Sequence, residues 1–421
     1  MVRGTFQIRA PMQGLVVSVR VSPGDQVRAG QTVAILQAMK MEHLVTAERS
    51  GVVTKVLVQA DAMVTPGETL VVLDAAGRVE RAEHEDQPRP LDEIRPDLAE
   101  VIARHAFGLD ENRPDAIAKR RKTGQRTARE NVTDLVDDGT FVEYGALVIA
   151  AQRRRRPIDD LIKRTPADGM VAGIGRVNGE AFGDVNTQCV VMSYDYTVLA
   201  GTQGTMNHLK KDRMFELAEQ RSLPVVLFSE GGGGRPGDTD HAIIAGLDCR
   251  AFQYFAKLSG KVPLIGVNSG RCFAGNAALL GCCDVVIATK ASNIGMGGPA
   301  MIEGGGLGVF APEQIGPAAS QYRAGVIDVL VDDDAAAVSA AKRCLSYFQG
   351  ATAAHRCADQ RLLRSAIPDN RLRVYDVRGV IETLADEGSV LELTGGFGLG
   401  MVTCLARIEG RPVGIIANNP T

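Results

Sequence analysis

The chain has 421 residues, with 47 Lys and Arg against 50 Asp and Glu and a net charge of −3. That length accommodates more than one domain with its own core, and the balanced charge argues against the basic surface of a nucleic-acid binder. No stretch approaches the roughly 18 uncharged apolar residues of a membrane span, and the first residues lack the apolar core of a signal peptide. We therefore expect a cytoplasmic protein that binds neither nucleic acid nor membranes.

Composition also limits the chemistry. The eight cysteines are scattered, without a CxxC pair or a histidine at zinc-finger spacing, so reduced core thiols and no metal site are predicted. None of the six histidines lies in a segment that indicates a general base. The 47 glycines and the absence of tryptophan indicate tight turns and close backbone approaches, which favours backbone amides as functional groups.

The first predicted unit, residues 1–75, contains an internal duplication. Residues 14–36 align with residues 51–73 without a gap, a shift of 37 positions with eight identities. Each copy alternates valine with polar residues and breaks at a turn, at 22–25 in the first copy and at 65–67 in the second. Two such copies predict a small all-β, two-fold sandwich.

Lys40 lies between the two copies, in the sequence AMKME, where a two-fold sandwich places the exposed tip of a hairpin. An ordinary surface lysine is the usual interpretation of such a residue. AMKM, however, resembles the biotin acceptor motif, and residues 5–75 resemble a biotinyl domain. Lipoyl domains share the sandwich but usually present an acidic residue before the lysine, so Met39 and Met41 favour biotin. The resemblance implies a covalent biotin on Lys40 and a biotin protein ligase that attaches it.

Residues 76–94 are charged, contain proline and show no apolar periodicity, as expected of a linker. At about 3.4 Å per extended residue, such a linker would span about 60 Å when stretched. Movement of the biotinyl domain is therefore expected.

Beyond a helical, basic stretch near residues 95–136, the sequence alternates predicted strands and helices. VVMSYDY (190–196) and PVVLFSE (224–230) are typical of buried strands, and residues 205–221 of an amphipathic helix. Residues 263–289 add a strand, a helix and a further strand. This order predicts an α/β layered fold.

A second duplication lies in this α/β region. Gly169, Met170, Val171, Arg176, Gly179 and Gly183 recur 231 positions later. Upstream, DGTFVE (138–143) recurs as EGSVLE (387–392) with a shift of 249, so the first copy holds 18 extra residues that span Arg153 to Arg156. The second copy ends soon after its shared start and is predicted to be incomplete: either the chain is a fragment, or another chain supplies the remainder.

Residues 95–421 resemble the β-type carboxyltransferase of acyl-CoA carboxylases, which contains two crotonase-like subdomains. The resemblance lies in TARE (127–130), DGTFVE, SYDYTV (193–198) with Gly201, SEGGGGR (229–235) and the segment from Tyr375 to Pro420. It implies a first α/β crotonase-like subdomain over 95–370 and the start of a second one over 371–421.

The resemblance implies an enzyme that carries carboxybiotin on Lys40 and transfers the carboxyl group to the α carbon of an acyl-CoA, from acetyl-CoA to longer chains. It also implies a biotin carboxylase domain or subunit that charges the biotin, since no segment resembles a nucleotide-binding carboxylase. The family forms carboxyltransferase dimers, so a homo-oligomer is expected. A biotin-dependent acyl-CoA decarboxylase and a non-catalytic carrier and assembly module remain alternatives.

The predicted catalytic groups are backbone amides, because the oxygen of an enolate needs paired donors as its charge develops. The glycine turn 231–235 follows a predicted strand, and Gly233 and Gly234 are the predicted donors; a flexible turn is the alternative. Gly275 and Asn276 resemble the second amide-bearing turn of crotonase-like folds, for which close packing of helix on strand is the alternative.

Two further segments are candidates for substrate binding. Gly297 and Gly298 belong to a glycine-rich stretch, 295–308, that resembles the acyl-pocket segment of the same family; a loop that crosses close to backbone is the alternative. Arg153, Arg154, Arg155 and Arg156 occur only in the first copy and are hypothesised to bind the phosphates of CoA. A solvated basic face or a subunit contact is the alternative.

Overall fold

The computed structural model describes residues 5–75, 90–235, 237–240 and 249–421, which fall into two compact units, Met1–Arg95 and Pro96–Thr421. Residues 76–89 of the predicted linker lie outside the described residues, and with them the expected reach and movement of the biotinyl domain. The predicted boundary between residues 370 and 371, inside the second unit, stays a prediction.

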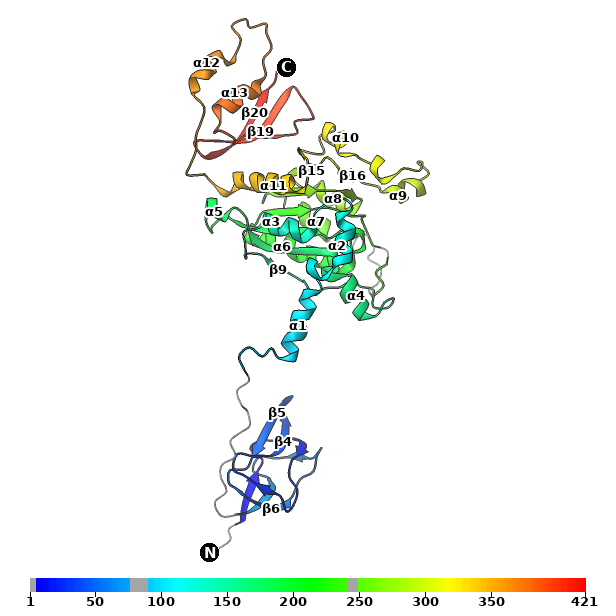
Figure 1. Cartoon of the computed structure of the whole chain (residues 1–421), viewed down its shortest axis with the longest axis vertical. Helices are drawn as coiled ribbons and strands as arrows, with labels where there is room; N and C mark the ends of the chain where they lie inside the picture. The colour runs from blue at the N-terminus through cyan, green and yellow to red at the C-terminus, as the bar shows by residue number, and fades with distance from the viewer. Residues whose placement is uncertain (1–4, 76–89, 236, 241–248) are drawn as a thin grey trace. The chain divides into compact units, whose positions relative to one another are not determined.

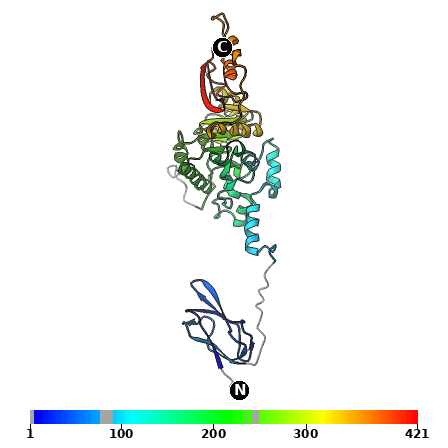
Figure 2. The same cartoon turned by 90° about the vertical axis from the view of Figure 1, so that its left-hand side faces the viewer.

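The described part of the first unit is a sandwich of two antiparallel four-stranded sheets, drawn in blue in Figure 2. One sheet has the order β1-β8-β6-β3 and the other β5-β4-β2-β7. The strands are β1 (Thr5–Arg9), β2 (Gly14–Val19), β3 (Gln26–Val27), β4 (Thr32–Ala38), β5 (Met41–Thr46), β6 (Gly51–Val56), β7 (Met63–Val64) and β8 (Thr69–Ala75). A shift of 37 residues carries β2, β3 and β4 onto β6, β7 and β8, which confirms the predicted two-fold sandwich.

The same close approach of a neighbouring strand explains the glycine at the start of each copy. A side chain on Gly14 would place its Cβ 2.9 Å from the carbonyl oxygen of Gln37, and one on Gly51 would lie 2.4 Å from that of Asp74. Gln37 and Asp74 are themselves equivalent under the shift of 37 residues. The close crossing of neighbouring strands therefore requires glycine at both places.

The second unit is built on a seven-stranded sheet within the described residues, of order β17-β15-β13-β12-β11-β10-β9. Strands β9 to β11 pair antiparallel, and β11, β12, β13, β15 and β17 pair parallel. The bounds are β9 (Val142–Glu143), β10 (Met170–Arg176), β11 (Gln188–Tyr194), β12 (Val225–Phe228), β13 (Leu264–Asn268), β15 (Val285–Thr289) and β17 (Val329–Val331). Two short strands, β14 (Arg271–Phe273) and β16 (Asn293–Gly295), pair in parallel as a separate sheet. They follow β13 and β15 in the sequence.

Helices cover both faces of the sheet (Figure 1), because successive residues of each strand point to opposite sides. The first helices are α1 (Pro96–Ala106), α2 (Pro114–Arg121), α3 (Ala128–Leu135), α4 (Ile158–Arg164), α5 (Gly179–Phe182), α6 (Thr205–Arg221) and α7 (Ala251–Ala256). The later ones are α8 (Gly275–Leu280), α9 (Pro299–Gly304), α10 (Ala318–Arg323), α11 (Asp334–Gln349), α12 (Leu363–Ala366) and α13 (Val377–Leu384). Helix α6 has the bounds predicted from the sequence.

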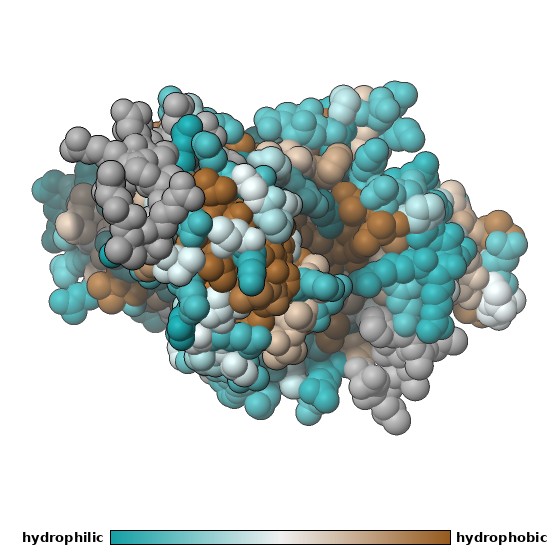
Figure 3. Space-filling view, turned by 90° about the horizontal axis from the view of Figure 1, so that it is seen from below, coloured by the Kyte–Doolittle hydropathy of each residue, from teal (hydrophilic) through white to brown (hydrophobic). Residues whose placement is uncertain are grey.

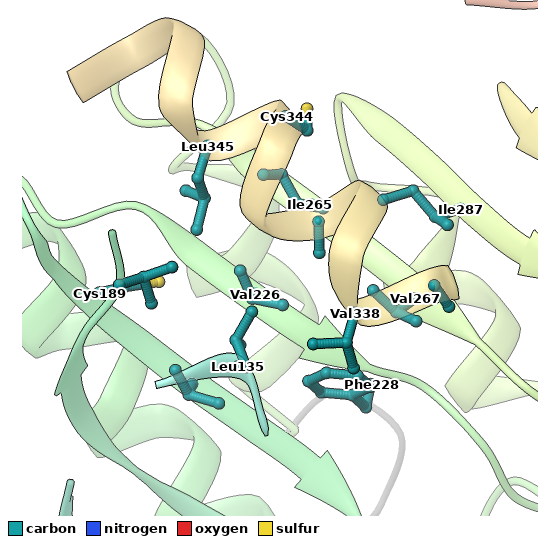
Figure 4. Packing of buried hydrophobic residues seen from close by; sticks show 14 of the residues in the cluster. Leu135, Cys189, Val226, Phe228, Ile265, Val267, Ile287, Val338, Cys344 and Leu345 are labelled. Atoms are coloured by element: carbon teal, nitrogen blue, oxygen red, sulfur yellow. The ribbon is translucent and has the colours of Figure 1, made fainter. Parts of the chain in front are cut away.

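Two cores result from this alternation. One face buries Val226, Ile265 and Ile287 under α3 and α11, and Figure 4 shows Val338 and Leu345 of α11 directed at these strand residues. The opposite face packs its own strand residues against α6 and α7. The predicted α/β layered fold is confirmed.

All eight cysteines lie in the described residues and are free thiols. Cys189, Cys272, Cys344 and Cys404 are buried, as predicted for core thiols. Cys357 is exposed, in an irregular segment that makes only an isolated β-bridge with Asp386, so the prediction of core thiols is wrong for this residue.

The second duplication is visible in strand register. Glu143 of β9 pairs with Gly173 of β10, and the equivalent Glu392 pairs with Cys404, where β18 (Leu391–Leu393), β19 (Met401–Ile408) and β20 (Arg411–Asn418) form the C-terminal sheet. Asp137 accepts from the N–H of Gly179, as Asp386 does from that of Gly410. The predicted match of Gly183 with Gly414 is wrong, because Gly183 ends α5 whereas Gly414 lies inside β20.

No helix in the described part of the chain is both long and apolar enough to cross a membrane. On the face shown in Figure 3, apolar residues reach the surface in patches among hydrophilic ones. Several exposed apolar side chains of the second unit follow β16: Met296, Met301, Leu307, Val309 and Phe310.

Candidate active site

Lys40 lies at the tip of the hairpin that joins β4 to β5. Ala38 pairs with Met41 across the two-residue turn, and the central residues Met39 and Lys40 have φ angles of 51° and 66°. Two positive φ angles define the turn type whose twist suits a tight hairpin, and they are costly for residues other than glycine. Met39 is 97% exposed and Met41 65%, so apolar side chains flank an exposed lysine on both sides.

The chemistry of this tip fits a covalently attached biotin. The Lys40 ammonium makes no hydrogen bond or ion pair with any described residue, and it stands clear of the sandwich core. An amide bond to Lys40 would therefore break no contact of the folded domain. Met39 and Met41 add apolar surface on either side of the lysine.

The glycine turn 231–234 connects three parts of the second unit. The N–H of Gly231 donates to Arg271 O at 2.8 Å, and its carbonyl accepts from Phe273 N at 3.0 Å. The N–H of Gly232 donates to Ala200 O at 3.3 Å. The turn is thereby held between β14 and the loop that follows β11.

A second turn lies directly beside it. A Cβ built on Gly233 would meet the Ala274 side chain at 2.7 Å and lie 3.7 Å from the backbone nitrogen of Gly275. Ala274 has φ 51° and ψ −123°, a conformation that is strained for any residue with a side chain. The N–H group of Gly275, which begins α8 and is half-buried, donates to no described residue and is therefore open to a ligand.

The Asn276 side chain joins the two turns. It is fully buried; its Oδ1 accepts from Gly233 N at 3.1 Å, and its Nδ2 donates to the carbonyls of Gly201 and Glu230 at 3.2 and 3.1 Å. The N–H of Gly233, a predicted donor to substrate, is thus already bonded inside the protein. The N–H of Gly234 has no partner among the described residues, and a side chain there would meet no atom within 4 Å.

A buried ion pair lies under the glycine turn. Arg120 of α2 donates to both carboxylate oxygens of Glu230, at 2.8 and 2.6 Å, and to Arg126 O at 2.8 Å. Burial raises the pKa of Glu230 to about 7, and the Arg120 guanidinium opposes that rise. This bidentate pair holds Glu230, the residue that immediately precedes the turn, in place.

Arg235 anchors the other end of the turn. Its side chain is 4% exposed; it forms an ion pair with the buried Asp168 and donates to Thr202 O at 2.8 Å. The carboxylate of Asp168 also accepts from Asn207 N at 2.8 Å, at the start of α6. The glycine turn is therefore held by charge at both ends.

The two candidate substrate segments lie in different places. Gly298 is 3.6 Å from the Phe273 ring, measured from a built Cβ, so this segment begins beside the second turn; the Cβ of Gly297 would meet only Met301 and Ile302. Arg153, Arg154, Arg155 and Arg156 are all exposed and lie against residues 237–240, which follow the glycine turn. Arg153 and Arg156 have acidic partners, Asp240 at 3.8 Å and Asp160 at 3.1 Å.

The structure contains a basic cavity of about 730 Å³ that the sequence did not predict. Arg113, Lys119, Arg120, Lys163 and Arg164 line it, with Leu199 from the loop that contacts the glycine turn. Arg113 is bound to Asp195 at 2.7 Å, whereas the ammonium groups of Lys119 and Lys163 have no partner among the described residues. The basic stretch near 95–136 was the available signal, but its meeting with α4 depends on tertiary structure.

Comparison with protein-family models matches residues 119–421 to the carboxyl transferase domain. The chain belongs to the carboxyl transferase family. Residues 6–73 match the family of biotin-requiring enzymes, which indicates a covalently attached biotin as the cofactor.

Two curated members of the carboxyl transferase family illustrate the relationship. The methylmalonyl-CoA carboxyltransferase 12S subunit of Propionibacterium freudenreichii subsp. shermanii is 32% identical over 317 residues, which cover 72% of this chain and 58% of the relative. The biotin-dependent long chain acyl-coenzyme A carboxylase beta4 subunit of Mycobacterium tuberculosis is 31% identical, over 77% of this chain and 61% of the relative. This chain therefore spans about three fifths of the length of these relatives.

Solved carboxyl transferase structures resemble this one over most of its length. A single-chain, multi-domain long-chain acyl-CoA carboxylase is 54% identical, with a TM-score of 0.75 over 100% of this chain and 40% of that chain. The transcarboxylase 12S hexamer with methylmalonyl-coenzyme A and methylmalonic acid bound is 28% identical, with a TM-score of 0.65 over 78% of this chain and 64% of that chain. Both likenesses place this fold among carboxyltransferases.

Proposed function

We propose that this chain carries biotin on Lys40 and catalyses the carboxyltransferase reaction of a biotin-dependent acyl-CoA carboxylase. The observation that carries the proposal is the fusion, in one chain, of a biotinyl sandwich with an exposed Lys40 to a carboxyl transferase fold with open backbone amides. Biotin, when bound, supplies the carboxyl group that is transferred. The acceptor is the α carbon of an acyl-CoA thioester.

The residues of this chain contribute mainly by stabilising negative charge. Loss of the α proton leaves an electron pair that moves onto the thioester oxygen, and that oxygen needs preorganised donors. We assign this role to the N–H groups of Gly234 and Gly275, because they have no partner among the described residues and neither residue is buried. The fully buried Asn276 contributes through its side chain, which bridges the two turns. Gly233 is reassigned from donor to anchor, since its N–H is bonded to the Asn276 side chain.

The phosphates of CoA have two candidate sites on this chain. Arg154 and Arg155 are the first candidate. Of the four arginines predicted to bind the phosphates, Arg153 and Arg156 already have acidic partners. Lys119 and Lys163 in the basic cavity are the second candidate, since unpaired ammonium groups there could meet phosphate oxygens.

Calorimetric titration with CoA separates these two sites. We expect replacement of Lys119 and Lys163 by alanine, or of Arg154 and Arg155, to weaken binding about tenfold and to reduce its salt dependence, according to which pair contacts phosphate. The other pair serves as the matched control. Unchanged affinity in both double variants would remove both sites.

The central experiment is carboxylation of acyl-CoAs of increasing length with ATP, bicarbonate and a biotin carboxylase. We expect Lys40→Arg to abolish both streptavidin labelling and product, because arginine cannot form the amide bond. Lys55→Arg, an exposed lysine of the same unit, should change neither. Labelling that survives in Lys40→Arg would contradict the assignment of the biotin site.

Long-chain acyl-CoA is the first substrate class to test, given the 54% identity to a carboxylase of that description. The alternative of decarboxylation has weaker support: methylmalonyl-CoA decarboxylase subunit alpha of Veillonella parvula is 28% identical over 77% of this chain. Release of CO2 from malonyl-CoA without ATP would favour that direction. If no carboxyl group is exchanged between malonyl-CoA and biotin, the result would favour a non-catalytic carrier and assembly module.

Three partners belong to the same proposal. A biotin carboxylase domain or subunit must charge the biotin, a biotin protein ligase must attach it, and a second copy of the chain must contribute to the carboxyltransferase dimer. We place the protein in the cytoplasm, where the attachment of biotin, its charging and the carboxyl transfer all have their substrates.

A further inference from the structure

Lys211 of α6 is among the largest fully buried side chains in the described part of the chain, with 0% of its surface exposed. It lies one turn before Met214 and Phe215, which belong to the core over the sheet. Burial of an ammonium group is costly unless its protons are bonded, so an apolar residue of similar volume would pack here at lower cost. Packing alone therefore does not explain a lysine at this position.

The polar contacts of Lys211 lead toward the glycine turn. Its Nζ donates to Tyr194 Oη at 2.9 Å, at the end of β11, and to Gln203 Oε1 at 2.8 Å. Gln203 also pairs by its backbone with the turn: its N–H donates to Gly233 O at 2.7 Å, and its carbonyl accepts from Arg235 N at 2.9 Å. The side chain and the backbone of Gln203 thus meet the turn from the same side.

The next link is Asn276. Gln203 Nε2 donates to Asn276 Oδ1 at 3.0 Å, and the same oxygen accepts from Gly233 N at 3.1 Å. A chain of hydrogen bonds therefore runs from Lys211 through Gln203 and Asn276 to Gly233, and every side chain in it is buried.

The direction of these bonds is determined at both ends. The Lys211 ammonium can only donate, so the Gln203 amide must turn its oxygen toward Lys211 and its NH2 toward Asn276. Backbone N–H groups only donate and carbonyls only accept, so Gly233, Gly201 and Glu230 require the same orientation of the Asn276 amide. Without a donor at position 211, the Gln203 amide could reverse. Its Oε1 would then face Asn276 Oδ1, and two acceptor oxygens would oppose each other.

We propose that Lys211 is a positioning residue for the carboxyltransferase site, which fixes the Gln203 amide and thereby the Asn276 bridge between the two amide-bearing turns. The role rests on the proposed function, because the turns matter through the open N–H groups of Gly234 and Gly275. Lys211 itself contacts no substrate.

The test compares Lys211→Met with Lys261→Met, an exposed lysine that forms an ion pair with Glu219 at the other end of α6. We expect Lys211→Met to lower kcat on the order of 10- to 100-fold, less than or equal to the loss of a direct oxyanion donor, with the KM for acyl-CoA unchanged. Lys261→Met should leave kcat unchanged.

A double-mutant cycle separates the relay from a general loss of packing. If Lys211 acts through Gln203, then adding Lys211→Met to Gln203→Met should lower kcat no further than Gln203→Met alone. Additive losses, or a change confined to KM, would overturn the proposal.

Amide hydrogen exchange on the full chain supplies a readout that needs no activity. Lys211→Met should speed exchange at Gly233 at least tenfold and leave the strands of the biotinyl sandwich unchanged. Unaltered exchange at Gly233 would overturn the coupling. Faster exchange together with a wild-type chain that shows no carboxyl transfer would instead retain the coupling and reject the proposed function.

Discussion

The ammonium group of Lys211 is fully buried, and burial lowers its pKa to about 7, although Cys249, Asp212 and Asp168 oppose the shift. In the unfolded chain a lysine keeps its proton up to about pH 10.4. Between these two values the unfolded state binds more protons than the folded state. The contribution of Lys211 to stability therefore rises with pH from about 7 to about 10.

Urea unfolding at pH 7 and pH 9 checks this prediction. We expect Lys211→Met to remove part of the rise in unfolding free energy that the wild type shows between the two pH values. Lys210, whose pKa burial lowers to about 8, contributes a rise of the same sign and stays in both proteins. The same pH dependence in wild type and variant would mean that Lys211 keeps its proton in the folded state throughout this range.

The environment of a single residue can be predicted from the sequence when the segments that determine it are close in the chain. The exposed hairpin position of Lys40 could be predicted because the repeat and the tip lie within a few dozen residues. The bond from Gly233 to Asn276 joins residues 43 positions apart, and the burial of Lys211 arises only when α6 packs on the sheet. Neither could be read from residue type or spacing.

At the scale of elements, Arg235 connects the glycine turn to two other segments. Its guanidinium and the carboxylate of Asp168 are both almost fully buried, with side-chain exposures of 4% and 0%. Removing one partner of such a pair leaves an uncompensated buried charge, which costs about 3–5 kcal/mol. We expect Arg235→Met to lower the unfolding free energy by about that amount.

The comparison variant is Arg213→Met, because Arg213 forms an exposed pair with Glu216 on the same helix, α6. Its loss should cost no more than about 1 kcal/mol. Replacing Asp168 by leucine together with Arg235→Met should cost less than the sum of the two single changes, since the buried carboxylate of Asp168 no longer remains without its partner. Chemical unfolding measures all four; equal losses for Arg235→Met and Arg213→Met would contradict this account.

Elements with a strong periodic pattern could be predicted well. The bounds of α6 and the strands around residues 190 and 225 follow from apolar periodicity, which depends on neighbours in sequence. The equivalence of Gly183 with Gly414 failed because the connection between β10 and β11 contains a helix, whereas β19 and β20 join in a tight turn. A shift of constant size cannot detect a difference in loop length.

For the whole molecule, two internal repeats made the division into a β-sandwich and an α/β unit predictable. A repeat reveals which segments must pack together before any contact is known. The basic cavity between α2 and α4 was beyond this reasoning, because its residues come from separate elements.

The last prediction concerns assembly. Helix α9 and its flanking segment extend away from the seven-stranded sheet (Figure 1), and they expose Met296 to 66%, Met301 to 63%, Leu307 to 74% and Val309 to 79%. Monomeric proteins rarely leave so many apolar side chains together in water. Since Gly297 and Gly298 lie in the same segment, we expect a second copy of the chain to cover it beside the candidate site.

Light scattering after size-exclusion chromatography measures this directly. The wild-type mass should be a multiple of the 44.7 kDa of one chain, and Met301→Glu with Val309→Glu should lower it because two buried carboxylates would be unpaired. Val185→Glu provides the control: Val185 is 88% exposed, in the connection between β10 and β11, and its change should leave the mass unaltered. A monomeric wild type, or an unchanged mass in the double variant, would assign the apolar segment to another role.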